Sequence, residues 1–501
     1  MWFTISLLGI VTFLFWYFSA PFYWRKRNVP YLKPFPIFGN FFSMFTKGLI
    51  DFNASLYTNF PGKPFYGLHF YTRPALFVKD PELIQKILIT DFEYFTSHGM
   101  YSNQDRDPAG GNLFHIYGQE WKEMRGKLSQ YFTPGKVKAM LTYVDKSLQK
   151  AMEHIDNNIA ANEPVEMKYV LMNITTDVIT QAIFGVETDT FKNKDSIFSE
   201  VAEQMFKVKL TSRTFVSIIS PKLYDLLKLC VLDDKSNATV VDIVRQTVEY
   251  RRKENVQMQD YLQGMMELMD NYTDSGQKYF PDRTRVPRYD LKTLVCQAIL
   301  LFAAGIETSA LTMTFFFYEM ATHPELQQKC REEVNKITKE TGQDINVSDL
   351  SKLVYLGAAL QETLRMHSPL SIINRECTKN YKIPGSDLEI EKGTFVFMSA
   401  VGIHMDPKYY PEPNVFRPER FMNGSKIKNG TFLPFGIGPR TCLGMSLAYG
   451  EMKMVTAKFL QNYEFTVCSK TDVPIKPGKY NFLKTPANGM WLKVRPLKNV
   501  N

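Results

Sequence analysis

The residue with the most distinctive surroundings is Cys442, which lies in the run Phe-Gly-Ile-Gly-Pro-Arg-Thr-Cys-Leu-Gly at 435–444. An apolar helical pattern starts just after it, so we expect its sulfur near the amino-terminal end of a helix. The partial positive charge at such an end favours a thiolate over a thiol. A thiolate is a ligand for iron, to which it donates electron density that promotes cleavage of an O–O bond.

The neighbours of Cys442 suit a flat ligand. Phe435 could shield the sulfur from water, and Arg440 could pair with a carboxylate of that ligand. The loop also carries glycines, which allow close backbone approach or a positive φ, at Gly436, Gly438 and Gly444. The alternative is a structural cysteine buried in a glycine-rich turn. A lone cysteine would favour that alternative, whereas the whole pattern favours a ligand.

A second motif, Ala304-Gly305-Ile306-Glu307-Thr308, lies midway along an apolar run over 291–322. The hydroxyl of Thr308 can bond the carbonyl of Ala304 and loosen the helix locally. Gly305 leaves room for a small ligand beside the backbone. The acid-alcohol pair Glu307 and Thr308 could relay protons through water, which makes these two the candidate catalytic residues.

The helix that carries this motif has clear ends. Asp290 can cap its start, and Pro324 limits its continuation. Its length and apolar character leave one alternative open, a second membrane span. In that case Gln297 and Glu307 would be costly in lipid without partners.

Two further pairs lie at helical spacing. Glu362 and Arg365 are three residues apart and therefore share a helix face, which by itself indicates a surface ion pair worth under about 1 kcal/mol. Trp121 and Arg125 are four apart on one face of a helix predicted from Gly118 to Tyr131. Taken alone, Trp121 would be interpreted as a core residue, and Arg125 as a surface arginine whose aliphatic stem covers apolar surface.

These motifs, in this order, resemble the cytochrome P-450 superfamily, whose cysteine-loop pattern the chain satisfies throughout. In detail the chain resembles insect microsomal family 6, through Asn374-Arg375-Glu376-Cys377-Thr378-Lys379 and the Phe-Thr-Pro-Gly-Lys run at 132–136. It departs from the usual pattern at Asn28, where a glycine is usual, at Ile306, where Phe is commoner, and at Gly357, which interrupts the helix of Glu362 and Arg365. The run Met445-Ser446-Leu447 lacks the basic residue that often follows the cysteine motif.

The resemblance implies a haem b cofactor with Cys442 as the axial ligand to iron. It implies cofactor contacts from Trp121, Arg125, Ala304, Gly305, Arg375, Phe435, Arg440, Cys442 and Gly444. It places Arg420 with Glu362 and Arg365 in a buried network that supports the cysteine loop. It also implies a substrate pocket lined by Phe114, Ile116, Phe206, Phe302, Ala303, Leu370, Ile372 and Phe482.

The architecture that must position these residues is mainly α-helical with small β-sheets. Helical periodicity predicts helices near 79–95, 118–150, 165–185, 196–215, 238–270, 290–322, 324–340, 352–367 and 443–462. Strand-like runs fall near 64–78, 371–397 and 479–495, and a polar surface loop is expected at 270–289. We expect three parts: an anchor at 1–24, a basic and proline-rich hinge at 25–40, and one catalytic domain at 41–501.

The amino terminus predicts a membrane anchor. Residues Trp2 to Trp24 carry no charge, and Arg25-Lys26-Arg27 follows at once. Such a helix is roughly 35 Å long, enough for a hydrocarbon core of about 30 Å. A cleaved secretory peptide would usually have a shorter apolar region and end in small residues. We therefore expect a single-pass protein of the endoplasmic reticulum, with a lumenal amino terminus and a cytoplasmic body.

Composition and charge agree with a cytosol-facing body. The six cysteines are far apart with no CxxC pair, which fits a reducing environment. The net charge of +9 is scattered over 501 residues, and no zinc-finger, RNA-recognition or sustained basic helix pattern appears, so nucleic acid is not an expected partner.

The function that these expectations favour is a haem-thiolate monooxygenase acting on small lipophilic substrates, xenobiotics such as plant toxins or insecticides, or endogenous lipids and hormones. Electrons would come from NADPH through a flavoprotein reductase, which would dock on the basic residues Lys122, Lys127, Lys136 and Lys138. Cytochrome b5 would be an optional second donor. Two alternatives stay open: a haem-thiolate isomerase or dehydratase, and a non-enzymatic haem sensor.

Overall fold

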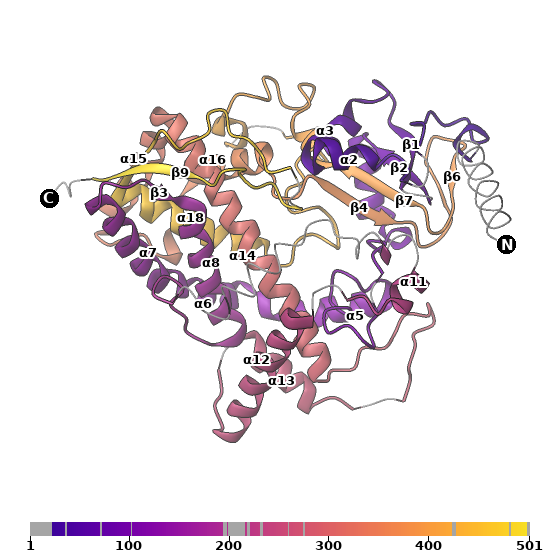
Figure 1. Ribbon diagram of the computed structural model, residues 1–501, viewed down its shortest axis with the longest axis horizontal. Helices are drawn as coiled ribbons and strands as arrows, with labels where there is room; N and C mark the ends of the chain where they lie inside the picture. Colours follow the sequence, from indigo (N-terminus) through magenta and orange to yellow (C-terminus); the bar gives the residue numbers. More distant parts are fainter. Residues whose placement is uncertain are drawn as a thin grey trace, which may run out of the picture.

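The fold is dominated by helices, as the periodicity predicts, with three small sheets on its margins (Figure 1). The computed structural model describes residues 23–35, 38–70, 73–101, 103–193, 198, 216–217, 221–230, 234–258, 260–273, 276–422, 427–479 and 482–497. The expected anchor at 1–24 lies almost wholly outside these residues, as does most of the helix expected at 196–215. Phe206 lies outside them too.

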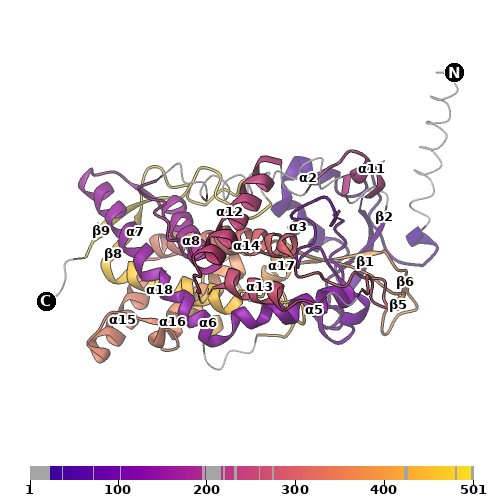
Figure 2. The same ribbon diagram turned by 90° about the horizontal axis from the view of Figure 1, so that it is seen from below.

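Helix α14, Leu291–Thr322, runs through the middle of the molecule, and the other long helices surround it (Figures 1 and 2). Asp290 caps its start by accepting a hydrogen bond from the amide of Thr293. Among the described residues it is the helix long and apolar enough to cross a membrane. Its apolar surface is instead buried by neighbouring helices, and the side chain of Gln297 is satisfied by the backbone of Gly111 and Leu113.

The remaining helices flank α14 or extend toward the sheets. The bounds are α2 Phe42–Lys47, α3 Leu49–Thr58, α4 Pro81–Gln85, α5 Gly118–Ser129, α6 Pro134–Leu141, α7 Tyr143–Ala160, α8 Met167–Phe184, α11 Pro221–Leu226, α12 Asp234–Lys253, α13 Tyr261–Asp270, α15 Pro324–Thr341, α16 Val354–Met366, α17 Ala400–His404 and α18 Met445–Asn462. Short 3₁₀ or π turns are η1 Lys86–Thr90, η2 Phe92–Tyr94, η3 Gln130–Phe132, η4 Val347–Asp349 and η5 Pro418–Phe421.

The largest sheet has the strand order β1-β2-β7-β4. Strands β1 and β2 form an antiparallel hairpin, β7 joins β2 in parallel, and β4 pairs antiparallel with β7. The other sheets have the orders β3-β9-β8 and β5-β6. The bounds are β1 Phe65–Phe70, β2 Arg73–Val78, β3 Val165–Glu166, β4 Ile372–Glu376, β5 Tyr381–Lys382, β6 Glu389–Ile390, β7 Phe395–Ser399, β8 Tyr463–Val467 and β9 Trp491–Pro496.

The segment expected to be a hinge packs on the edge of this sheet. Trp24, which was expected to be the last residue of the anchor, is instead fully buried against β1 and donates its indole N–H to the carbonyl of Leu68. The amide of Gly67 donates to the carbonyl of Pro30 at 2.7 Å. The proline-rich stretch is therefore held against β1 by backbone hydrogen bonds, and the tryptophan just before it packs on the same strand.

Several element boundaries differ from the sequence-based expectation. The helix expected over 79–95 is divided into α4, η1 and η2, and α18 is followed at once by β8, which periodicity did not predict. In the strand-like run expected at 479–495, regular strand pairing begins only at Trp491, the first residue of β9. The loop expected at 270–289 is present, since α13 ends at Asp270 and α14 begins at Leu291.

Candidate active site

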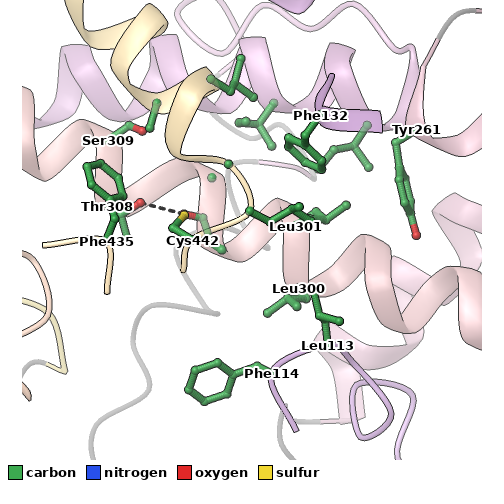
Figure 3. A pocket seen from close by; sticks show the side chains of 18 of the residues that line it. Leu113, Phe114, Phe132, Tyr261, Leu300, Leu301, Thr308, Ser309, Phe435 and Cys442 are labelled. Atoms are coloured by element: carbon green, nitrogen blue, oxygen red, sulfur yellow. Dashed lines mark hydrogen bonds between the residues drawn. The ribbon is translucent and has the colours of Figure 1, made fainter. Parts of the chain in front are cut away.

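A cavity of about 230 Å³ lies between α14, α8, α5 and the cysteine loop. Most of its wall is apolar, with Leu113, Phe114, Leu300, Leu301 and Phe132 projecting into it in Figure 3. The Cys442 side chain lies at one end of this space, close to Thr308, Ser309 and Phe435. The cavity therefore joins the two motifs that the sequence singled out.

The cysteine loop is a tight turn that ends at α18. The amide of Cys442 donates to the carbonyl of Phe435 at 2.9 Å, which closes the loop. Gly438 has a φ of 79°, and a Cβ there would lie 1.9 Å from the carbonyl oxygen of Leu88, so only glycine fits. Phe435 lines the cavity and packs against Tyr449.

Opposing effects act on the pKa of the Cys442 thiol. Burial among protein atoms raises the pKa of the thiol, while the amide of Gly444 and the charge of Arg125 lower it. Gly444 is the N-cap of α18, so the expected stabilisation from a helix start is present. In the protein alone it is outweighed by desolvation. The side chain nevertheless remains accessible from the cavity, as an iron ligand must be.

Three arginines surround the same end of the cavity without a carboxylate partner among the described residues. Arg125 donates to the carbonyl of Thr441 at 2.9 Å, and Arg440 donates to the carbonyls of Leu113 and Ile116. Arg375 donates to the carbonyl of Asn374 at 2.8 Å.

Burial lowers the pKa of all three guanidinium groups, to about 10 for Arg375. The Arg440 pKa is lowered further by the charges of Arg375 and Arg125. The Nε atoms of Arg375 and Arg440 are buried and have no hydrogen-bond partner in the described structure. Buried cations of like charge with free donors call for an anion.

These residues fit haem. The accessible sulfur offers an axial ligand, the arginines offer donors for two propionates, and Trp121 lines the cavity with its ring under Arg440 at 4.7 Å. Trp121 and Arg125 lie on α5 as the spacing predicts. Arg375 does not line the cavity, but its guanidinium contacts the ring of His98, and His98 does line the cavity.

The distal wall is the middle of α14. The Thr308 hydroxyl donates to the carbonyl of Ala304 at 2.8 Å, as expected, and Ala304, Gly305 and Thr308 all line the cavity. At Gly305 a Cβ would come within 2.6 Å of the Ile179 side chain on α8. This glycine therefore also permits close packing of the two helices.

Glu307 points elsewhere. It is buried outside the cavity lining, and its carboxylate lies 3.6 Å from the ammonium of Lys168 on α8. Burial raises its pKa, and the charge of Lys168 opposes that shift. The sequence placed Glu307 beside Thr308, yet the fold gives it a cation partner on another helix.

The scaffold pair forms the expected buried network. Arg365 donates to both oxygens of Glu362, which also accepts from Arg420 at 3.2 Å. Arg365 further donates to the carbonyl of His404, whose ring accepts from the amide of Leu433 just before the cysteine loop. The alternative of a surface ion pair is wrong, since Glu362 and Arg365 are both fully buried.

Of the eight expected substrate-pocket residues, Phe114 lines the cavity and stacks on His98. Phe302 faces away, toward Phe184 and Phe198. Ile116 contributes its carbonyl to Arg440 rather than its side chain to the cavity. The others described are outside the lining: Ala303 packs against the main core, Ile372 against the sheet, and Leu370 and Phe482 are exposed.

Sequence reasoning missed several lining residues. Leu300 and Leu301 precede Ala304 and Gly305 by four positions, so the helical repeat around Thr308 could have found them. Glu451, a carboxyl inside the apolar pattern of α18, was a visible anomaly. Residues of α8, namely Ile179, Ala182 and Ile183, and Tyr261 of α13 gave no such signal, because only the tertiary fold brings them here.

In the part of the chain that the structure describes, a mainly helical fold brings together an accessible cysteine, a mostly apolar cavity and arginines without carboxylate partners, which is the arrangement that a haem-thiolate protein needs. A sequence model of the cytochrome P450 family matches residues 29–492. The chain is 34% identical over 509 residues to a Drosophila melanogaster protein named probable cytochrome P450 6a14, with 99% of both chains covered. It is 31% identical over 513 residues to cytochrome P450 6A1 of Musca domestica, covering 99% and 98%.

A relative from Blattella germanica, cytochrome P450 6k1, is 29% identical over 94% of this chain and 93% of its own. The chain therefore belongs to the cytochrome P450 family, and it resembles insect members of family 6 over its full length. It is a P450 monooxygenase, whose family carries haem on a cysteine thiolate.

Proposed function

We propose that this monooxygenase oxidises small lipophilic compounds, foreign substances such as plant toxins or insecticides or endogenous lipids and hormones, with electrons from an NADPH-dependent flavoprotein reductase. The observation that carries this proposal is the cavity itself. Aliphatic and aromatic side chains make up most of its wall, and Cys442 lies at one end. Such a wall favours apolar ligands, because burying apolar surface is the main source of their affinity.

Bound haem supplies the oxygen chemistry, and the chain supplies the surroundings. Cys442 would hold the iron, and Arg125, Arg375 and Arg440 would hold the propionates. Phe435 covers the loop, and the remaining apolar wall excludes water. Thr308 presents a hydroxyl to the cavity while bonded to Ala304, so it can hold water and pass a proton.

The electron donor is expected on the side where α5 and α6 lie, opposite α12 in Figure 2. Lys122 and Lys138 are exposed there, and Lys127 and Lys136 are half-buried. A basic surface attracts an acidic reductase and speeds the encounter. We also propose anchorage in the endoplasmic reticulum membrane through residues 1–24, with the body in the cytoplasm and cytochrome b5 as an optional second donor.

The proposal is tested by reconstitution of the purified holoprotein with an NADPH-dependent reductase and a panel of plant toxins, insecticides, fatty acids and hormones. We expect substrate-dependent NADPH consumption together with an oxygenated product. Conversion of an oxygenated substrate without reductase would favour an isomerase or dehydratase instead. Haem binding without turnover on any member of the panel would favour a sensor.

The relay role of Thr308 has a matched control. Thr312 makes the same back-bond, to the carbonyl of Thr308 at 2.8 Å, but lies outside the cavity lining. Thr308→Ala should lower product formed per NADPH about tenfold or more, because positioned proton transfer contributes about 10²–10⁴-fold. Thr312→Ala should leave that ratio near the native value. Equal ratios in the two variants would remove the relay role.

A further inference from the structure

A second cavity, of about 470 Å³, lies between α5, the start of α14 and the loops at 104–111 and 278–290. It has no described lining residue in common with the cavity that Cys442 faces. Ligand pockets in proteins usually have volumes of about 300–1,000 Å³. This second cavity is therefore large enough to hold a small organic ligand independently of the haem site.

One wall of the second cavity is a short hairpin at 278–286 that is fixed by hydrogen bonds. The amide of Val286 donates to the carbonyl of Lys278 at 3.1 Å, which closes the hairpin. The carboxylate of Asp282 accepts from the amide of Gln119 at 2.8 Å, which holds the hairpin against the start of α5. This wall is therefore preformed, and a preformed wall lowers the ordering cost of binding a ligand.

The rim of the second cavity carries an excess of positive charge. The lining holds three acidic and four basic side chains, namely Asp105, Glu120, Asp290, Lys278, Arg285, Arg288 and Lys292. Arg285 is already paired, because it donates to both carboxylate oxygens of Asp105, at 2.6 and 2.7 Å. The other three basic side chains are exposed and form no ion pair with the part of the chain that the structure describes.

The remaining acidic side chains do not offset these cations. Asp290 is engaged as the cap of α14, where it accepts from the amide of Thr293 at 2.8 Å. Glu120 is 7% exposed, and burial raises the pKa of its carboxyl to about 7, so much of it is uncharged near neutral pH. Exposed cations above a floor that can be neutral favour the binding of an anion.

We infer that the second cavity is a ligand site for a small organic anion, whose acid group lies against Lys278, Arg288 and Lys292. The apolar body of the ligand lies against Pro287 and the ring of Tyr279, which also line the cavity. Binding is non-covalent, and it does not depend on the proposed function, because the two cavities have separate linings.

The test is a calorimetric titration of the purified holoprotein with naphthalene-2-sulfonate, a probe that stays ionised at every pH used. An azole bound to the haem iron occupies the first cavity, so the titration reports binding elsewhere. We expect saturable binding with a dissociation constant below about 1 mM. The uncharged naphthalene-2-sulfonamide should bind about tenfold more weakly or worse, because it cannot form charge-assisted hydrogen bonds with the cations.

Variants of the lining locate the binding site. Arg288→Gln together with Lys292→Gln should raise the dissociation constant about tenfold or more, and Lys278→Gln should raise it about threefold. Lys339→Gln, at an exposed position of α15 outside both linings, is the control and should leave it unchanged. Glu120→Gln should tighten binding about threefold at about pH 8, where the native carboxyl is mostly ionised, but not at about pH 6.

Native affinity in the variants of the three cations, equal affinity for the sulfonamide, or loss of binding once the azole is bound would overturn the inference. So would a Glu120→Gln variant that follows the native affinity at both pH values. The spectrum of each reduced, carbon-monoxide-treated variant shows whether its haem site is intact, which separates lost binding from a folding defect. Absence of turnover on every substrate would overturn the proposed function and leave the binding result unchanged.

Discussion

Arg365 donates two hydrogen bonds to Glu362, at 2.7 and 2.8 Å, and neither side chain is exposed to solvent. Arg420 and the amide of Arg417 complete the contacts of the same carboxylate. A buried charge that loses its partner keeps its desolvation cost. Breaking this pair should therefore cost more stability than breaking an exposed pair at the same spacing.

Replacing Arg365 with alanine should lower the free energy of unfolding by about 3–5 kcal/mol, because Glu362 would stay buried without its main partner. The midpoint of thermal unfolding should fall accordingly, and less holoprotein should be recovered. Arg245→Ala is the control. Arg245 forms an exposed ion pair with Asp242 at the same three-residue spacing, and exposed pairs contribute about 0–1 kcal/mol. Equal midpoints for the two variants would show that the buried network contributes little.

Loss of a cation from the arginine cluster should weaken haem retention. Arg440→Gln should raise the rate of haem loss roughly 10- to 100-fold, since a hydrogen bond to a charged group contributes about 1.5–3 kcal/mol. Transfer of haem to an acceptor protein measures that rate. Arg285→Gln serves as the control, because Arg285 already has a carboxylate partner in Asp105 and lies outside this cavity. Haem loss from Arg440→Gln at the Arg285→Gln rate would contradict the propionate assignment.

Stability should depend on pH through Glu120. Glu120 is 7% exposed, and burial raises the pKa of its carboxyl to about 7 from the ordinary 4.5. The native state then binds a proton more tightly than the unfolded state, so the contribution is present below about pH 4.5 and is lost as pH rises to about 7.

Glu120→Gln should therefore reduce the fall in stability across that range, by at most about 3 kcal/mol. Denaturant unfolding at several pH values measures the effect. Glu325→Gln, at an exposed position at the start of α15, should leave the pH dependence unchanged. A Glu120→Gln curve parallel to the native one would show that Glu120 is ionised normally in the folded protein.

Electron transfer should depend on charge at α5. Lys122→Glu should slow reduction by the reductase about tenfold at low salt, because it places a like charge opposite an acidic partner. The difference should shrink as salt is raised. Lys253→Glu, at the exposed end of α12, changes the net charge equally but outside α5 and α6. Equal slowing by both variants would contradict a defined docking surface.

The sequence predicted the parts of the site that lie within single elements. The position of Cys442 just before a helix, the cap at Asp290, the back-bond from Thr308 and the shared helix of Trp121 and Arg125 all depend on local geometry, which spacing reveals. The positions of long helices such as α14 follow from periodicity in the same way.

What the sequence did not predict depends on packing between distant segments. Whether a residue of α14 faces the cavity depends on which helices lie beside it, so Glu307 meets Lys168 while Phe302 meets Phe184. Ser309 and Glu451 line the same cavity although they lie far apart in the chain. Short elements such as η1 and β8 are set by their neighbours rather than by their own periodicity.

The central claim is that the thiolate of Cys442 binds the haem iron, and absorption of the reduced, carbon-monoxide-treated protein tests it most directly. We predict the red-shifted band diagnostic of thiolate ligation in the native protein and in Cys468→Ser, which changes another accessible cysteine. Cys442→Ser should lose that band. A native protein without it, or a Cys442→Ser variant that keeps it, would contradict the account.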